Sequence, residues 1–219
     1  MEKHTEEKLS FVDKVAIFLS KNFKGIIIGG ILILVILAAI VVVSLVNTNN
    51  NEKAYTALSA LEALYDETLT EDKNADEFIA AADALIESGK DSYPGYKAKY
   101  LKALYSYKTE DFSNALDLFY DVYEASSEDF LGSVALINAA AAAENSGDAD
   151  LALEYYKKVW DDYSTTSPVS AKALFNTARL YEASDIELAK GTYQQLADQY
   201  TGTSDSEYAK LAKARLATL

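Results

Sequence analysis

The stretch NSGDADLALEYYKKVW, residues 145–160, recurs in the chain at a fixed spacing. Residues 108–123 read KTEDFSNALDLFYDVY, and residues 182–197 read EASDIELAKGTYQQLA. In each copy a polar turn ending in Asp precedes an alanine, and an aromatic side chain follows four residues after that alanine. Both residue types recur every 37 residues, at Ala115, Ala152 and Ala189 and at Phe119, Tyr156 and Tyr193. Such a period predicts a stack of similar structural units.

Each copy has a partner segment with helical composition just before it. These segments are residues 96–107, 133–144 and 170–182, and each has a small residue at the same place: Ala103, Ala140 and Thr177. A small residue lets two helices approach closely, and a large one beside it fills the groove between them. A looser fourth copy at 73–88 places Ala81 and Leu85 at the two positions, after a first helix at 52–67. Residues 204–218 are expected to form a helix that caps the array.

These alanine–aromatic pairs resemble tetratricopeptide repeats, whose unit is two antiparallel helices. The resemblance implies an all-α, right-handed array of about four helical hairpins over residues 54–219. The period of 37 is longer than the usual 34, and the tryptophan of the opening helix is absent.

Residues 25–46, GIIIGGILILVILAAIVVVSLV, form an uncharged stretch before this array. A helix of this length covers about 33 Å, enough for a hydrocarbon core of about 30 Å. The run is too long for a cleaved signal peptide, so we expect a single permanent transmembrane helix. A polar linker, 47–53, would join it to the array.

The flanking charges predict the orientation of this helix. Five lysines lie in residues 1–24, which we expect to form a cytoplasmic amphipathic arm, whereas only Lys53 lies just beyond the apolar run. The positive-inside rule then places the array outside the cytoplasm. Gly25 and Gly29 form a GxxxG pair, a spacing that permits contact between membrane helices, but the pair lies at the cytoplasmic edge of the stretch, which favours a chance match.

The composition excludes several kinds of chemistry. The chain has no cysteine and one histidine, His4, and it has no glycine-rich phosphate loop. We therefore expect no catalytic residue, no metal site and no cofactor, and hence no enzyme activity or small-molecule substrate. Residues 25–219 carry 15 basic and 30 acidic residues, so the array should not bind nucleic acid. Function is left to protein-binding surfaces.

In a stack of hairpins the first helix of each pair lines a groove that can hold a peptide. The residues expected to face this groove are Lys97, Tyr100, Leu104, Tyr107, Val134, Ile137, Glu144, Leu174, Ala178 and Tyr181. The alternative is that about half of them belong to the core between repeats.

The whole layout resembles the YfgM-type family, through FVDKVAIFLSKNFKGIIIGGILIL (11–34) and YPGYKAKYLKALYSYKTEDFSNALDLF (93–119). Members of that family lie in the bacterial inner membrane with a periplasmic repeat domain. The resemblance implies an accessory role at the Sec protein-export channel, with a periplasmic prolyl isomerase chaperone and exported clients as partners. Two other roles stay open: a scaffold for assembly of cell-envelope complexes, and a homo-oligomeric spacer paired through the GxxxG helix.

Overall fold

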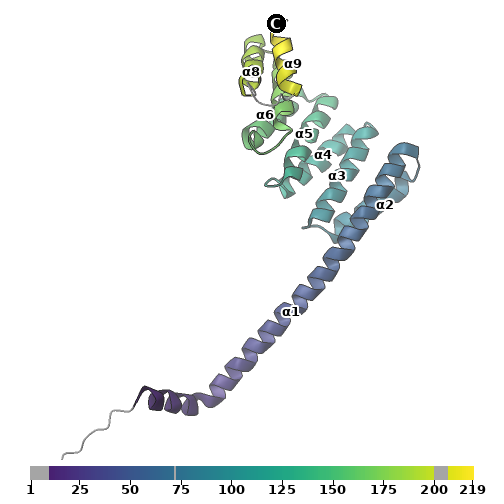
Figure 1. Cartoon of the computed structure of the whole chain (residues 1–219). Coiled ribbons are helices and arrows are strands. Elements are labelled where there is room, and N and C mark those ends of the chain that lie inside the picture. The colour runs from purple at the N-terminus through teal and green to yellow at the C-terminus, as the bar shows by residue number, and fades with distance from the viewer. Residues whose placement is uncertain (1–9, 72, 200–206) are drawn as a thin grey trace, which may run out of the picture. The chain divides into compact units, whose positions relative to one another are not determined.

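The computed structural model describes residues 10–71, 73–199 and 207–219, and the regular elements in these ranges are all helices. They are α1 (Phe11–Glu71), α2 (Ala75–Ser88), α3 (Tyr93–Lys108), α4 (Phe112–Ala125), α5 (Phe130–Asn145), α6 (Ala149–Tyr163), α7 (Ser170–Tyr181), α8 (Ile186–Gln199) and α9 (Glu207–Leu216) (Figure 1). The chain divides into two compact units, Met1–Lys53 and Ala54–Leu219. We describe each unit by itself.

The first unit consists, in its described part, of the N-terminal portion of α1. Its large apolar side chains are exposed, and from Leu32 to Leu37 their exposed fractions run from 53% to 66%. Among the described residues, no helix has both the length and the apolar character needed to cross a membrane. The described part of the structure therefore does not support the transmembrane helix expected at 25–46. Gly25 lies in α1 with open space around it, and the surroundings of Gly29 fall outside the described residues.

Helix α1 is longer than the sequence analysis predicted. The expected linker, residues 47–53, is helical, and α1 runs through it to Glu71. The polar run NTNNN lowers helix propensity but contains neither proline nor glycine, so nothing in it interrupts the backbone hydrogen bonds. Residues 11–24 of the expected N-terminal arm are also helical, and residues 1–9 lie outside the described ranges.

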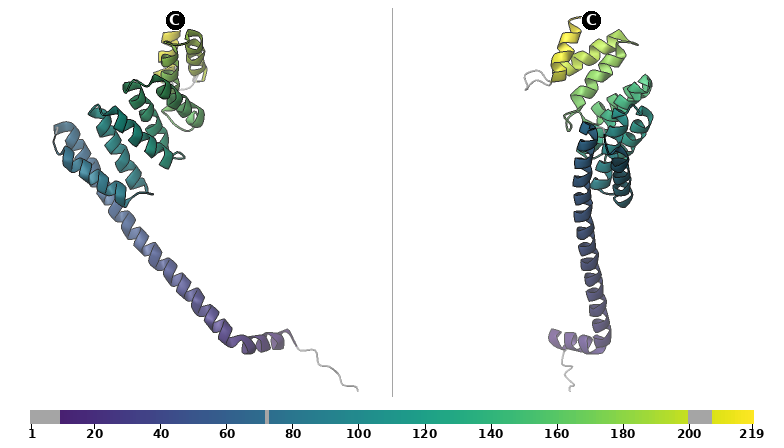
Figure 2. Two further views of the ribbon diagram at one scale, coloured as in Figure 1. Left: turned by 180° about the vertical axis from the view of Figure 1, so that it is seen from behind. Right: turned by 90° about the vertical axis from the view of Figure 1, so that its right-hand side faces the viewer.

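The second unit is an array of antiparallel helical hairpins. Over the described residues it contains four, formed by the last part of α1 with α2, by α3 with α4, by α5 with α6 and by α7 with α8, and α9 packs on the last of them (Figure 2). Each second helix also contacts the first helix of the next hairpin. The expected helical-repeat fold is confirmed.

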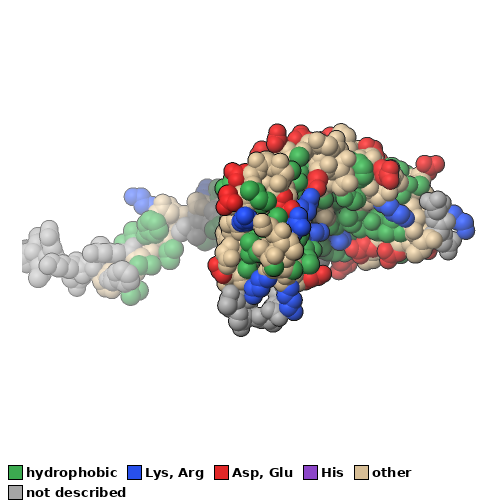
Figure 3. Space-filling view, turned by 90° about the horizontal axis from the view of Figure 1, so that it is seen from above, with side chains coloured by type: hydrophobic (Ala, Val, Ile, Leu, Met, Phe, Trp, Pro, Cys, Tyr) green, Lys and Arg blue, Asp and Glu red, His purple; other side chains and the backbone are tan. Residues whose placement is uncertain are grey.

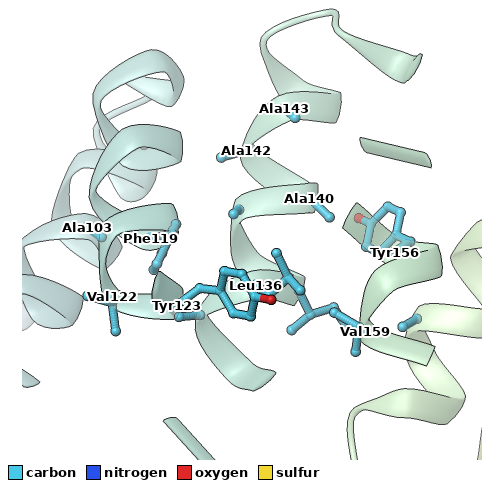
Figure 4. Close-up of a cluster of buried hydrophobic side chains, with 14 of the residues drawn as sticks. Ala103, Phe119, Val122, Tyr123, Leu136, Ala140, Ala142, Ala143, Tyr156 and Val159 are labelled. Carbon is cyan, nitrogen blue, oxygen red and sulfur yellow. The ribbon is translucent and has the colours of Figure 1, made fainter. Parts of the chain in front are cut away.

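The repeated residues form the core of this unit. Ala115, Ala152 and Ala189 have no exposed surface, and Phe119, Tyr156 and Tyr193 are at most 2% exposed. Figure 4 shows α5 between its neighbours, with Phe119 from α4 on one side and Tyr156 from α6 on the other. Residues 139–143 of α5 are all alanines, and four of them are fully buried. Their small side chains leave room for these aromatic rings.

The phase predicted for the first copy was wrong. Ala81 is partly exposed, whereas Phe78 and Ala82 are fully buried. Phe78 lies 37 positions before Ala115, and Ala82 lies 37 positions before Phe119. The 37-residue period therefore extends to the first hairpin, where the large residue stands at the position of the small one and the small residue at the position of the large one. Phe78 and Ala82, and not Ala81 and Leu85, are therefore the equivalents of Ala115 and Phe119.

Two kinds of turn separate the helices. Within the last three hairpins an aspartate begins the second helix, and Asp111, Asp148 and Asp185 accept hydrogen bonds from backbone amides of the first turn. In the first hairpin Asn74 takes this place and makes no side-chain cap hydrogen bond. Gly147 before Asp148 has a φ of +92°, and Glu110 before Asp111 has a φ of +63°.

At the turns that precede α3 and α5, the chain passes so close to itself that only glycine fits. A Cβ atom added to Gly95 would overlap the carbonyl group of Gly89, and one added to Gly132 would overlap the carbonyl group of Ser126. Both pairs are separated by six residues, and the second pair lies 37 residues after the first. Glycine is therefore required at the start of α3 and α5 for close packing, and not for an unusual φ.

Candidate functional site

A single line of accessible side chains runs along α5. Between Leu131 and Ala143 every residue is buried except Val134, Asn138 and Ala141, and the line continues to Glu144 and Asn145 at the end of the helix. The spacing of three and four residues places these side chains on one side of the helix. The other sides of α5 pack against neighbouring helices.

The same line continues on the two neighbouring first helices. Of the ten positions 37 residues before or after this line, three are buried, namely Leu101, Ala171 and Ala178. The other seven carry side chains that are at least partly exposed: Lys97, Leu104, Tyr107 and Lys108 on α3, and Phe175, Tyr181 and Glu182 on α7 and at its end. We call these residues, together with the line on α5, the open face. It presents aromatic, aliphatic, amide and a few charged groups from three successive hairpins.

The structure separates the ten expected groove residues into two sets. Six lie on the open face: Lys97, Leu104, Tyr107, Val134, Glu144 and Tyr181. The other four are at most 8% exposed and belong to the core: Tyr100, Ile137, Leu174 and Ala178. The alternative interpretation, that part of the set is core between repeats, applies to these four.

Sequence reasoning missed six residues of the open face: Lys108, Asn138, Ala141, Asn145, Phe175 and Glu182. The signal for α5 was present, because Asn138 is the only polar residue between Val134 and Ala143. A polar side chain in a run of alanines indicates which side of the helix meets solvent.

Amides and phenols on this side of the array are joined between repeats. The Nδ2 atom of Asn138 donates to Tyr100 Oη at 2.8 Å, and the Nδ2 atom of Asn145 donates to Tyr107 Oη at 2.8 Å. Burial raises the pKa of Tyr100 to about 12, so its hydroxyl stays protonated at neutral pH. These bonds hold α3 and α5 in register and orient the amide groups.

Two copies of a glutamate–tyrosine–arginine network follow. In the first, Glu144 Oε2 accepts from Arg179 Nη2 at 2.6 Å and from Tyr156 Oη at 3.3 Å. Three helices meet there: α5 supplies the glutamate, α6 the tyrosine and α7 the arginine.

The second network repeats this arrangement in the next hairpin. Glu182 accepts from Tyr193 Oη at 2.6 Å and from Arg215 Nε at 2.9 Å. The hydrogen bonds from Arg215 hold the pKa of Glu182 down, to about 2, and that from Tyr193 adds to the effect. In both networks the arginine belongs to the following hairpin or to α9, so each glutamate ties one repeat to the next.

From α2 onward, charge is divided between the two kinds of helix, whereas residues 54–71 of α1 carry four acidic residues and no basic one. The helices α3, α5, α7 and α9 together carry nine Lys or Arg and two Glu, whereas α2, α4, α6 and α8 carry 13 Asp or Glu and three Lys. Part of this charge is paired between helices, as in Lys99–Asp121 at 2.8 Å. Figure 3 shows acidic side chains gathered along the edges of the array, with hydrophobic and basic side chains between them. The open face is therefore much less acidic than the chain as a whole.

No group of three or more His, Cys, Asp or Glu in the described part of the chain could hold a metal ion. The carboxylates of the open face are engaged by arginine. The arrangement provides contact area and hydrogen-bonding groups for another molecule.

Comparison with known families and structures agrees with this architecture. Residues 134–166 and 172–203 match the model of the tetratricopeptide repeat. The array is tetratricopeptide-like. The two matched stretches cover most of α5–α6 and of α7–α8, the hairpins that supply the glutamate and the tyrosine of each network.

Among solved structures, the array is similar to a proposed kinesin light chain of Podosopora anserina with nearly identical TPR-like repeats. The two chains are 15% identical with a TM-score of 0.58, and the match covers 74% of this chain and 85% of the other. A single-substitution variant of the same protein gives the same values. No curated protein matches this sequence. The likeness concerns the fold, and tetratricopeptide repeats support a role as a protein–protein interaction module.

Proposed function

We propose that this protein is a membrane-anchored interaction module that binds other polypeptides through the open face. The observation that carries the proposal is the single accessible line on α5, which has exposed or partly exposed counterparts at most of the positions 37 residues away on α3 and α7. It gives a partner access to three consecutive hairpins at once, and helix α5 offers no other accessible side within its central turns.

The chemistry of the open face fits an extended polypeptide. Asparagine amides can donate to and accept from a peptide backbone, and tyrosine combines a large apolar ring with a polar tip. The low net charge of the open face admits partners that an evenly acidic surface would repel. Because the hydrogen bonds to Tyr100 and Tyr107 already orient the amides, a partner would bind with little further ordering of this face.

Attachment to a membrane is proposed from residues 25–46. The stretch has no charged residue and is long enough for a bilayer. The six consecutive exposed side chains from Leu32 to Leu37 point to all sides of a helix, and a helix that is apolar on every side needs an apolar environment. The lysine excess before it favours a cytoplasmic N-terminus and an array on the other side of a bacterial inner membrane.

The resemblance to the YfgM-type family suggests the partners. In that case the array would contact the Sec protein-export channel, a periplasmic prolyl isomerase chaperone or exported clients. An accessory role in protein export is thus the most specific form of the proposal.

The open face can be tested with one matched pair of variants. Ala141→Arg introduces a long charged side chain in the middle of the open face, and Ala125→Arg introduces the same side chain at an exposed position of α4. Each tagged full-length variant is purified from native membranes, and the copurified proteins are identified by mass spectrometry. We expect Ala141→Arg to lose partners that the native chain and Ala125→Arg retain. If both variants retain the same partners, the open face is not the binding surface.

A separate experiment tests the anchor. A reporter that is active only outside the cytoplasm, fused after Leu219, should be active in the full-length chain and inactive after deletion of residues 1–46. Activity of a cytoplasm-specific reporter at the same position would contradict the proposed orientation. The same deletion should remove copurification with the export channel. Continued copurification would show that the repeats alone bind the channel and that residues 25–46 only hold the chain at the membrane.

A further inference from the structure

The first hairpin has an apolar groove on the side where the array begins. It lies between α1 and α2, has a volume of about 670 Å³, and is lined mainly by Ala60, Leu61, Leu64, Ala81, Ala84 and Leu85. Ala60 and Ala84 are exposed, whereas Leu61 and Leu85 reach into the core of the hairpin with 2% and 5% exposed surface. The groove is open to solvent and is separate from the open face.

The packing of the next hairpin indicates what fits such a place. Helix α2 covers α3: the rings of Phe78 and Tyr105 are 5.5 Å apart, and Lys102 Nζ pairs with Asp83 Oδ1 at 2.5 Å. Helices α4 and α6 cover α5 and α7 in the same way. Every later first helix is thus covered by the second helix of the hairpin before it. No hairpin precedes α1 in the described part of the chain, so its corresponding side lacks this cover.

An α-helix is the element that this groove would hold. The alanines lie in the groove beside larger leucines, an arrangement that lets the backbone of another helix approach closely while its larger side chains pack between the leucines. In the array the same role is performed by α2, whose buried residues Phe78, Ala82 and Leu85 recur at spacings of four and three.

Charge decides which helix would fit. Residues 54–88 contain nine acidic residues and one lysine, Lys73. Glu67 and Glu77 line the groove itself, and neither has an ion-pair partner among the described residues. A second copy of this hairpin would bring the same acidic groups to the contact and be repelled, whereas a helix with basic flanks would be attracted.

We propose that the α1–α2 groove docks a basic amphipathic helix of another protein, which covers α1 in the way that α2 covers α3. This surface adds a second binding site, with its own partner chemistry, to the open face. The protein would then act as a connector, held by a basic helix at its first hairpin while the open face binds a second polypeptide.

The absence of cysteine from the sequence makes a direct test possible. Ala84→Cys introduces one labelling site in the groove for bimane, whose emission shifts when it becomes buried. The full-length labelled chain, in nanodiscs of phosphatidylcholine, is titrated with a synthetic helical peptide that carries a leucine–alanine strip and lysine flanks. We expect a saturable emission shift, with binding about tenfold weaker, or about 1.4 kcal/mol, for the same peptide with glutamate flanks. Equal binding of the two peptides would overturn the proposal, and empty nanodiscs measure binding to lipid.

Matched variants locate the binding site. Ala60→Arg should abolish the emission shift by filling the groove, and Glu77→Gln should weaken lysine-peptide binding and its salt dependence. Glu154→Gln on α6 is the charge-matched control, and Ala141→Arg on the open face should leave this titration unchanged, so the two proposals can fail separately. If sedimentation instead detects self-association that Ala60→Arg removes, the occupant is a second copy and the proposal is wrong.

Discussion

Replacing Gly132 by alanine should destabilise the array far more than one methyl group normally does. The new Cβ atom would overlap the carbonyl oxygen of Ser126 and lie 2.8 Å from its carbonyl carbon and 2.9 Å from Ser127 Cα. All three neighbours are backbone atoms, so no side-chain rotation can relieve the overlap. Overpacking costs about 1–3 kcal/mol, and we expect the upper end because α5 must move away from the end of α4.

The measurement is a thermal unfolding curve of the full-length variant. For a domain of this size 1 kcal/mol corresponds to about 2–4 °C, so the midpoint should fall by about 6–12 °C. Gly191→Ala is the control, because Gly191 is exposed in α8 with no atom near the added Cβ. Removing that glycine from a helix should stabilise by up to about 1 kcal/mol. A Gly132→Ala midpoint within about 2 °C of the native chain would refute the argument from close packing.

Three other predictions concern caps, charge and the core. Glu110→Gly should raise the free energy of unfolding of the array, measured with urea, by up to about 1 kcal/mol, because glycine adopts the φ of +63° without strain. Gly147→Ala should lower it by a similar amount, because alanine is strained at a φ of +92°. Glu182, whose pKa is lowered to about 2 from 4.5, contributes stability that is present above pH 4.5 and lost as the pH falls towards 2. Between pH 6 and pH 3, the free energy of unfolding measured with urea should therefore fall less for Glu182→Gln than for the native chain. An equal fall in both chains would show that Glu182 does not contribute to the acid sensitivity. Ala140→Leu, at a fully buried site, should lower the urea midpoint by an amount equivalent to about 1–3 kcal/mol, whereas an unchanged midpoint would indicate unfilled space around α5.

Much of the core was predictable from the sequence because it depends on side-chain size at a fixed period. Ala115 and Phe119, with their later counterparts, were found from the 37-residue spacing alone. The first hairpin was misaligned because Phe78 and Ala82 fill the same volume with large and small residues exchanged. Packing requires only that the two side chains together fill the available volume, so the large residue can stand at either position. A search for an alanine followed by a large residue does not find the reversed order.

The other features depend on contacts that no local pattern contains. The need for Gly132 arises from the backbone of Ser126, which meets it only after the turn has formed. The networks around Glu144 and Glu182 join residues from three helices, so neither the partners nor their order could be inferred from one segment. On the open face, Asn138 was a usable signal, but its relation to Tyr100 becomes visible only when α3 and α5 lie side by side.

The direction of the glutamate–tyrosine–arginine networks determines how the array ends. Each arginine lies in a helix that follows the hairpin of its glutamate. The hydrogen bonds of one hairpin are therefore complete only when the next helix in the chain is present. Helix α9 supplies Arg215 for the last one. Shortening the chain before α9 would remove this clamp and uncover Tyr193 and Leu196 on α8, which α9 helps to bury. Loss of one short helix at the end would thus weaken the preceding hairpin, which supplies Arg179 to Glu144, and would also weaken the connection between α7 and α5.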